Sequence, residues 1–166
     1  MRVGVAGALG KMGRVTCTAI AGAPDLELVA GFARRAGALE SGLDLFDDLD
    51  AFYRQPMDVV VDFTTYPATV DVARKAVAAG VAPVIGATGW KPQDVVALRD
   101  AVARAQLGAL LVPNFAIGAV ILMRLAELAA PHFRGVEIVE MHHETKKDKP
   151  SGTAQLTAER IEAVAP

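Results

Sequence analysis

The chain has 166 residues, with 17 basic and 19 acidic side chains, so its formal net charge is only −2. This near balance offers no broad positive surface for nucleic acid. The longest uncharged run, 107–123, is divided by Pro113 and is shorter than the roughly 20 apolar residues of a membrane span. It therefore argues against a membrane partner and favours a buried strand followed by a core helix. No signal peptide is recognisable, and the single cysteine, Cys17, fits a reducing cytoplasm.

The N-terminal segment predicts a dinucleotide-binding turn. An apolar run at 3–6 is typical of a buried parallel strand, and a helical pattern follows it. Between them, Gly7 permits a tight turn, Gly10 lets the backbone approach a pyrophosphate, and Gly13 allows close packing of helix on strand. The alternative is a tight turn without a ligand. The predicted apolar face of the helix is Met12, Val15, Thr16, Ala19 and Ile20, and the predicted cofactor contacts are Gly7, Gly10, Lys11, Met12 and Gly13.

The segment after the second predicted strand, 26–32, bears on the choice of cofactor. Dinucleotide folds usually place an acid there for the ribose hydroxyls, but this sequence reads Ala33-Arg34-Arg35. A guanidinium group stays charged and can donate two parallel hydrogen bonds to a 2′-phosphate. We therefore expect Arg34 to contact the phosphate of NADPH, with NADH as the second possible cofactor. Arg35 either joins it or forms a solvent-exposed basic turn.

Strand and helix patterns alternate through the rest of the first two thirds of the chain. Predicted strands cover 57–63, 81–85 and 110–112, and predicted helices cover 68–79 and 92–106. This order predicts an α/β fold with a doubly wound parallel sheet, in which ligands bind beyond the carboxyl ends of the strands. The candidate cofactor contacts at those ends, each with ordinary loop chemistry as the alternative, are Phe63, Thr64, Gly86, Ala87, Thr88, Pro113, Asn114 and Phe115.

A second candidate site lies near the C-terminus. Residues 136–139 predict an apolar strand, and Ser151 is a good N-cap for an amphipathic helix over 151–163. The first backbone amides of that helix, at Gly152 and Thr153, can bind a carboxylate or phosphate group.

Titratable side chains lie just before this helix. His142 or His143 can donate a proton near neutral pH, and Lys146 supplies a positive charge for an anionic substrate. No other soft ligand accompanies the histidines, so no metal is expected. On composition alone, a solvated basic loop is the favoured interpretation of this segment.

Five motifs in a fixed order now carry a family resemblance. They are Gly7–Gly13, Val61-Asp62-Phe63-Thr64, Gly86-Ala87-Thr88-Gly89, Pro113-Asn114-Phe115 and residues 140–154. Together they resemble the dihydrodipicolinate reductases, also called 4-hydroxy-tetrahydrodipicolinate reductases. The resemblance implies a Rossmann domain at 1–115 and a mixed α/β substrate-binding domain at 116–166.

The resemblance also implies an activity and an assembly. It implies NAD(P)H-dependent reduction of a cyclic dicarboxylate in lysine and diaminopimelate biosynthesis, in a cytoplasmic homotetramer. It implies His142 as the catalytic acid and Lys146 as its cationic partner. The substrate contacts it implies are His143, Lys146, Ser151, Gly152 and Thr153.

The sequence departs from the family pattern at three points. Ala33 replaces an acid and Ala87 replaces a threonine, while family members continue beyond Pro166. The substrate domain is therefore expected to be incomplete, with a single strand at 136–141. Two alternatives stay open: a nucleotide-binding regulatory module without catalysis, and another Rossmann dehydrogenase of amino-acid metabolism. The cluster at 142–153 favours the reductase, because a pure binding module has no use for it.

Overall fold

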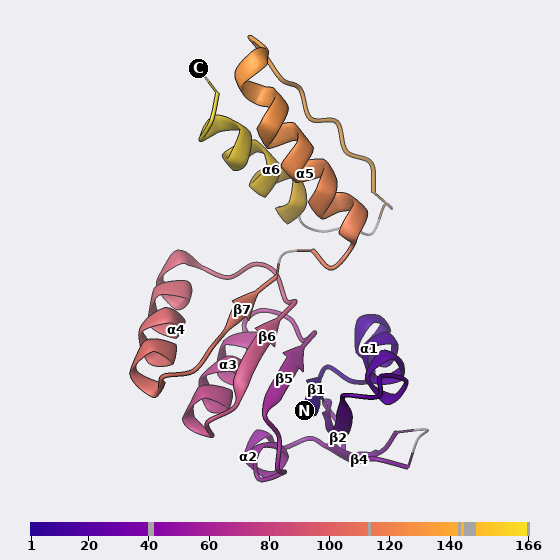
Figure 1. Ribbon diagram of the computed structural model, residues 1–166. Coiled ribbons are helices and arrows are strands. Elements are labelled where there is room, and N and C mark those ends of the chain that lie inside the picture. Colours follow the sequence, from indigo (N-terminus) through magenta and orange to yellow (C-terminus); the bar gives the residue numbers. More distant parts are fainter. Residues whose placement is uncertain (40–41, 113, 143, 145–148, 166) are drawn as a thin grey trace. The chain divides into compact units, whose positions relative to one another are not determined.

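The protein, seen here in a computed structural model (Figure 1), consists of two compact units. The first is Met1–Val112 and the second is Pro113–Pro166. The structure describes residues 1–39, 42–112, 114–142, 144 and 149–165.

A seven-stranded sheet forms the centre of the first unit. Every pair of neighbouring strands is parallel except β3 and β4, which form an antiparallel edge. The α/β class and the doubly wound parallel sheet are therefore confirmed, with a short antiparallel edge that was not predicted. In sheet order the strands are β3 (Gly37–Ala38), β4 (Asp44–Phe46), β2 (Glu27–Phe32), β1 (Arg2–Ala6), β5 (Val59–Asp62), β6 (Ala82–Ile85) and β7 (Leu110–Leu111).

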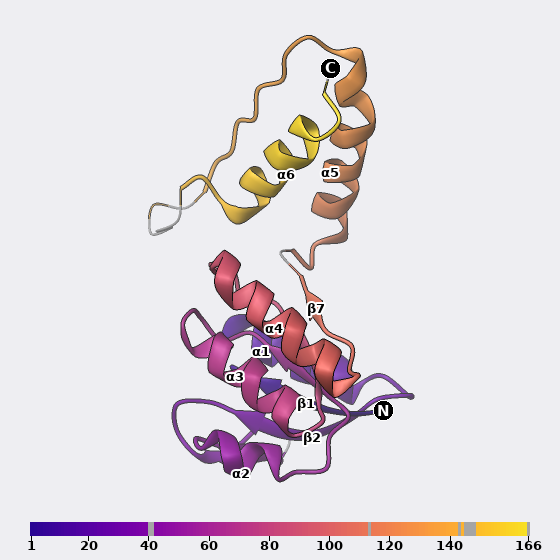
Figure 2. The same ribbon diagram turned by 90° about the vertical axis from the view of Figure 1, so that its left-hand side faces the viewer.

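Helices cover both faces of this sheet (Figures 1 and 2). Helix α1 (Lys11–Ala21) packs on one face, and α2 (Leu49–Tyr53), α3 (Ala68–Ala78) and α4 (Pro92–Ala105) lie on the other. Phe52 of α2 is fully buried and contacts the rings of three neighbouring aromatic residues, with ring centroids 5.0–6.5 Å apart. This dense packing fixes the strand ends that carry the candidate site.

The predicted buried face of α1 is confirmed at Ile20 but wrong for most of its other residues. Met12 and Val15 are exposed, whereas Gly13 and Ile20 are buried and Cys17 packs against the same cluster. The reason is that Gly13 has no side chain and packs directly against the backbone of Gly7 and Ala8, so this position faces the sheet. Positions four and seven residues later then share the face.

The second unit contains a helical pair. Helix α5 (Ile117–Ala129) continues into a short 3₁₀ helix (Ala130–His132) and packs against α6 (Gly152–Glu162). The prediction that α5 is a core helix is wrong for this structure, since Ile117 is 78% exposed and Leu128 is 69% exposed. One neighbouring helix covers only one side of an apolar helix, and Met123 lies on that buried side. The preceding strand is also exposed, because β7 is an edge strand with β6 on one side alone.

The predicted strand at 136–139 is also wrong, because these residues form no β-ladder with any described part of the chain. A strand requires a neighbouring backbone to receive and donate its hydrogen bonds. Val139 is 86% exposed, so the segment lacks packing as well as pairing. It is an irregular, extended connection that leads from the 3₁₀ helix toward the residues preceding α6.

Candidate functional site

The glycine turn after β1 has the geometry that its spacing predicts. Gly7 adopts a φ of +78°, and its carbonyl accepts a hydrogen bond of 2.9 Å from the Gly10 amide. A Cβ atom at Gly13 would lie 2.1 Å from the carbonyl oxygen of Gly7, so no other residue fits there without moving the backbone. Gly7 and Gly13 therefore set the turn and the close approach of α1 to the sheet.

The N-terminus of α1 is arranged to bind an anion. Its N-cap is Gly10, which has no side chain to accept a hydrogen bond from the first amides of the helix. Lys11 and Met12 are exposed in the first turn, and the guanidinium of Arg14 donates to the carbonyl of Leu9 at 3.2 Å. Uncapped amides and the helix dipole attract a negative group, such as a pyrophosphate.

The ends of β1 and β5 meet beside this turn. The Phe63 amide donates to the carbonyl of Ala6 at 2.9 Å, and a Cβ atom at Gly7 would lie 2.7 Å from the carbonyl oxygen of Phe63. The chain winds outward in opposite directions from this pair of strands. Ligands of open α/β sheets bind at such a switch point, so Phe63 and Thr64 border the expected cofactor position.

A buried carboxylate organises this edge, and the sequence did not identify it as a site residue. Asp62 is 0% exposed and accepts hydrogen bonds from the Thr64 amide at 2.7 Å and from the Thr69 hydroxyl at 2.5 Å. Burial raises the pKa of Asp62, while the bonds from Thr69 and Thr64 act in the opposite direction. Asp62 thus ties the end of β5 to the first turn of α3. Its position inside a strand–turn–helix junction was the available signal.

The remaining candidates of the first unit lie at neighbouring strand ends. Arg34 and Arg35 are both exposed directly after β2, as a site for a 2′-phosphate requires. At the end of β6, the Gly86 amide donates to the carbonyl of Asp62 at 2.8 Å. Ala87 is buried and Thr88 is exposed. These positions share the carboxyl edge of the sheet with the glycine turn.

In the second unit, the N-terminus of α6 is capped as predicted. The Ser151 hydroxyl accepts a hydrogen bond from the Ala154 amide at 3.1 Å and donates its own proton to the carboxylate of Glu140. The same carboxylate accepts a bond of 2.8 Å from the Ser151 amide. Gly152 and Thr153 form the first turn beyond this cap. Glu140 was not predicted as a site residue, although it lies within the family motif.

Two further side chains meet this helix end. Asn114, predicted as a cofactor contact, donates from its amide to the hydroxyl of Thr153 at 3.1 Å. His142 places its Nδ1 atom 3.6 Å from a carboxylate oxygen of Glu140. Phe115 is exposed nearby in the chain. Glu140 therefore lies against both His142 and Ser151, and Asn114 separately bonds Thr153. The predicted site residues His143, Lys146 and Pro113 lie outside the described residues.

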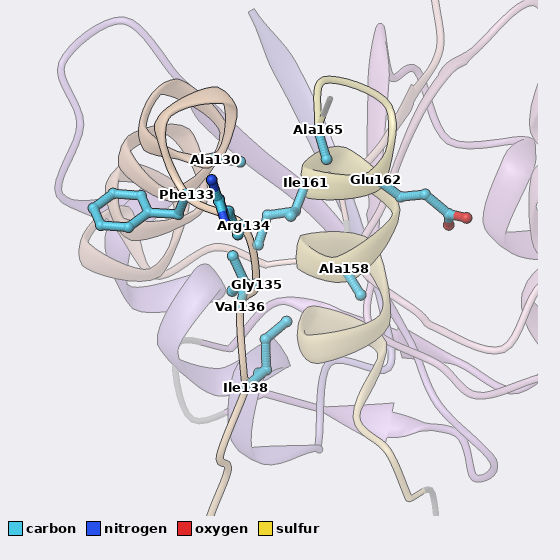
Figure 3. A pocket seen from close by; sticks show the side chains of 10 residues that line it. All are labelled: Ala130, Phe133, Arg134, Gly135, Val136, Ile138, Ala158, Ile161, Glu162 and Ala165. Atoms are coloured by element: carbon cyan, nitrogen blue, oxygen red, sulfur yellow. The ribbon is translucent and has the colours of Figure 1, made fainter.

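A cavity of about 330 Å³ lies elsewhere in the second unit (Figure 3). It is formed by the end of α6, including Ala158 and Ile161, and by the extended segment that includes Ile138. Among the described residues that line it, Arg134 carries a positive charge. Ile161 is ten residues from Ser151, or about 15 Å along a helix, so this part of the cavity lies away from the Ser151 end of α6.

The described residues contain no group of three histidine, cysteine, aspartate or glutamate side chains placed to hold a metal ion. They also contain no helix with the length and apolar character needed to cross a membrane.

Similarity to known proteins extends over the whole chain. Residues 1–115 match the family model for the N-terminus of dihydrodipicolinate reductase, and residues 118–165 match the model for its C-terminus. The 4-hydroxy-tetrahydrodipicolinate reductase of Syntrophomonas wolfei is 47% identical over 99% of this chain and 66% of its own length. That of Streptococcus pneumoniae is 42% identical over 99% and 65%. The chain thus spans just under two thirds of the length of these relatives.

Solved structures give the same relationship. A dipicolinate-bound dihydrodipicolinate reductase from a Paenisporosarcina species superposes with a TM-score of 0.86 and 34% identity, covering all of this chain and 67% of the other. An NAD-binding protein from Listeria innocua has a TM-score of 0.61 and 22% identity over 78% of this chain and 41% of its own, which shows a shared fold only. On the strength of the two family models and the 47% identical relative, this chain belongs to the dihydrodipicolinate reductase family.

Proposed function

We propose that this chain carries the nucleotide site and the proton-donating site of an enzyme that reduces 4-hydroxy-tetrahydrodipicolinate to tetrahydrodipicolinate. The observation that carries the proposal is 47% identity to a 4-hydroxy-tetrahydrodipicolinate reductase across 99% of the chain. The reaction belongs to lysine and diaminopimelate biosynthesis. The dipicolinate in the related structure supports a cyclic dicarboxylate as the substrate.

The first unit fits a nicotinamide dinucleotide. The glycines at 7 and 13 let the turn and α1 pack closely on the sheet, and the N-cap Gly10 has no side chain to cover the first amides of α1, which are proposed to face a pyrophosphate. Phe63 and Thr64, with Gly86 to Thr88, would border the nicotinamide end. The bound nicotinamide supplies a hydride to the substrate. This chain's residues hold and orient the cofactor at the edge of the sheet.

We further propose that the cofactor is preferentially NADPH. Two exposed guanidinium groups, at Arg34 and Arg35, stand where an acid would select the ribose diol of NADH. Arg34→Ala should weaken NADPH binding by roughly tenfold or more and leave NADH binding nearly unchanged, because only NADPH loses a charge-assisted bond. Fluorescence titration of both cofactors measures this, with Arg104→Ala on α4 as the control. Tighter binding of NADH than of NADPH by the unmodified chain would refute the preference.

The second unit would bind and protonate the substrate. The amides of Gly152 and Thr153, at the Ser151 end of α6, would bind a substrate carboxylate, Lys146 would add positive charge, and His143 would be a further substrate contact. Loss of the 4-hydroxyl group as water gives the conjugated ring. Hydride addition to that ring leaves an electron-rich enamine, which His142 protonates.

His142→Gln should therefore lower turnover by roughly 10²–10⁴-fold and change cofactor binding little. Steady-state kinetics with a separate cofactor titration would separate the two effects. Near-normal turnover in this variant would remove His142 from the mechanism.

Three coarser features complete the proposal. We assign residues 1–115 to the dinucleotide-binding domain and 116–166 to part of the substrate domain. The enzyme is proposed to act in the cytoplasm, in line with a single cysteine, and to assemble as a homotetramer. Exposed apolar side chains along α5, such as Ile121 and Leu125, support burial in a larger assembly.

The test of the proposed function is the loss of nicotinamide absorbance with freshly generated substrate. It should be run with the 166-residue chain and with any longer form of the protein. Oxidation that requires both substrate and nucleotide supports the reductase. Nucleotide binding without turnover in every form would favour the regulatory module, and turnover with an amino-acid semialdehyde would favour another Rossmann dehydrogenase.

A further inference from the structure

The described contacts of the Glu140 carboxylate include the Ser151 amide, the Ser151 hydroxyl and the His142 ring. One oxygen, Oε1, accepts from the Ser151 amide at 2.8 Å. The other, Oε2, accepts from the Ser151 hydroxyl and lies 3.6 Å from Nδ1 of His142. The carboxylate is about three quarters buried, with 26% of its side chain exposed.

A carboxylate can accept a hydrogen bond at each of its two oxygens, which suits the donors of Ser151 and the ring nitrogen of His142. Both of its oxygens accept, whereas the side-chain amide of glutamine has a single acceptor oxygen and a nitrogen that donates. The Ser151 hydroxyl already accepts from the Ala154 amide, so its own proton is directed to Glu140. A glutamine at this position would therefore direct an N–H group either at the Ser151 donors or at Nδ1 of His142.

The consequence for His142 concerns its two ring nitrogens. A negative oxygen beside Nδ1 favours the neutral tautomer that carries its proton on Nδ1. The Nε2 atom is then the nitrogen that gives up its proton when the imidazolium becomes neutral. This is the state that a general acid needs, with one nitrogen held by the protein and the other turned to the reaction.

We propose that Glu140 is a positioning residue, which holds the Nδ1 side of His142 and fixes it to the N-terminus of α6. The inference rests on the proposed function, in which His142 delivers the proton. The one carboxylate links the proton donor to Ser151, the cap of the helix whose first amides are proposed to bind the substrate. Proton donor and substrate carboxylate are thereby held by a common side chain.

The decisive measurement is the tautomer of the neutral His142 ring, observed by long-range ¹H–¹⁵N NMR of the 166-residue chain. The chain has three histidines, so the signals of His142 are identified by their loss in His142→Gln. The unmodified chain should show the Nδ1–H form in excess. Glu140→Gln should remove or reverse that excess, whereas Glu137→Gln, an exposed control on the same segment, should not. An unchanged tautomer ratio in Glu140→Gln overturns the proposal.

A second variant, Ser151→Ala, tests whether any effect of Glu140→Gln comes from loss of the α6 cap instead of loss of the carboxylate. Ser151→Ala removes the competing hydroxyl donor and leaves the carboxylate, so the Nδ1–H excess should persist or grow. Its loss in Ser151→Ala would show that the cap, and not the carboxylate, orients the ring, which also overturns the proposal.

Kinetics then separate positioning from the proposed activity. In a form that turns over, Glu140→Gln should lower kcat by about ten- to hundredfold with the cofactor KM unchanged. The loss is smaller than the ~10⁴-fold caused by neutralising a buried orienting carboxylate, because Glu140 is partly exposed. An unchanged kcat overturns the role of Glu140. A tautomer response in a protein that never turns over supports the positioning while refuting the proposed reaction, so the two failures are distinguishable.

Discussion

The two units of this protein differ in what holds their candidate sites in place. In the first, Val5, Phe52, Val60 and Ile85 are fully buried, and the strand ends are fixed by a parallel sheet with helices on both faces. In the second, large apolar side chains on α5 are exposed, and the site is held by a few hydrogen bonds around Glu140 and Asn114. Backbone geometry fixed by a core needs no further partner, whereas a site held by side-chain bonds depends on each one.

The largest expected contrast comes from truncating one apolar side chain in each unit. Phe52→Ala should lower the free energy of unfolding by about 3–5 kcal/mol, because it leaves a cavity among packed rings. Leu128→Ala, at a position 69% exposed, should change it by no more than about 0.5 kcal/mol. Urea unfolding can be followed by fluorescence of Trp90, the sole tryptophan, for the first unit and by circular dichroism for both. Equal losses would show that α5 is buried in solution.

The glycine turn provides a second contrast, within α1. Gly13→Ala should cost about 3 kcal/mol or more and weaken nucleotide binding, because its Cβ would meet the backbone oxygen of Gly7 at 2.1 Å. Gly22→Ala is the matched control at the other end of the helix, where a Cβ would have ordinary contacts at 3.6 Å or more and φ is −89°. The free energy of unfolding of that variant should lie within about 0.5 kcal/mol of the value for the unmodified chain. A tolerated alanine at position 13 would contradict the described turn.

The same division explains how much the sequence could predict. The long elements of the first unit follow from alternating periodicity, and the glycine turn follows from its spacing, because both are local signals. Strands β3 and β4 and helix α2, with two, three and five residues, are too short to produce a period. The buried face of α1 was predicted correctly only at Ile20, because the close approach at Gly13 decides which positions face the sheet. The helical spacing of apolar residues had instead placed Met12 and Val15 on the buried face.

Prediction of the candidate sites was limited by long-range partners. Ser151 was predicted as a cap because capping is local, and the structure confirms it. The partners Asp62–Thr69 and Glu140–Ser151 depend on turns that bring side chains seven and eleven residues apart into contact. The strand predicted at 136–139 failed for a related reason. Its apolar residues fit a sheet, but pairing requires a second strand that the described residues do not provide.

The smallest expected effect concerns two aspartates of the first unit with opposite pH behaviour. Burial raises the pKa of Asp62 above the ordinary 3.8, so the folded state binds its proton more tightly than the unfolded state does. Stability from this group should therefore fall as the pH rises from 3.8 through the raised value. At Asp58 the hydrogen bonds from Arg2 lower the pKa to about 2, so its contribution is present above 3.8 and is lost as the pH falls toward 2. Denaturation midpoints measured across this pH range test both contributions. Asp62→Asn should remove the decline in stability above pH 3.8, and Asp58→Asn should remove the loss of stability below pH 3.8.

Both changes in stability should be small, because Asp58 and Arg2 are exposed to solvent and Asp62 keeps two hydrogen bonds when it ionises. A decline above 3.8 that survives in Asp62→Asn would show that a different carboxyl group, and not the one that ties β5 to α3, is responsible.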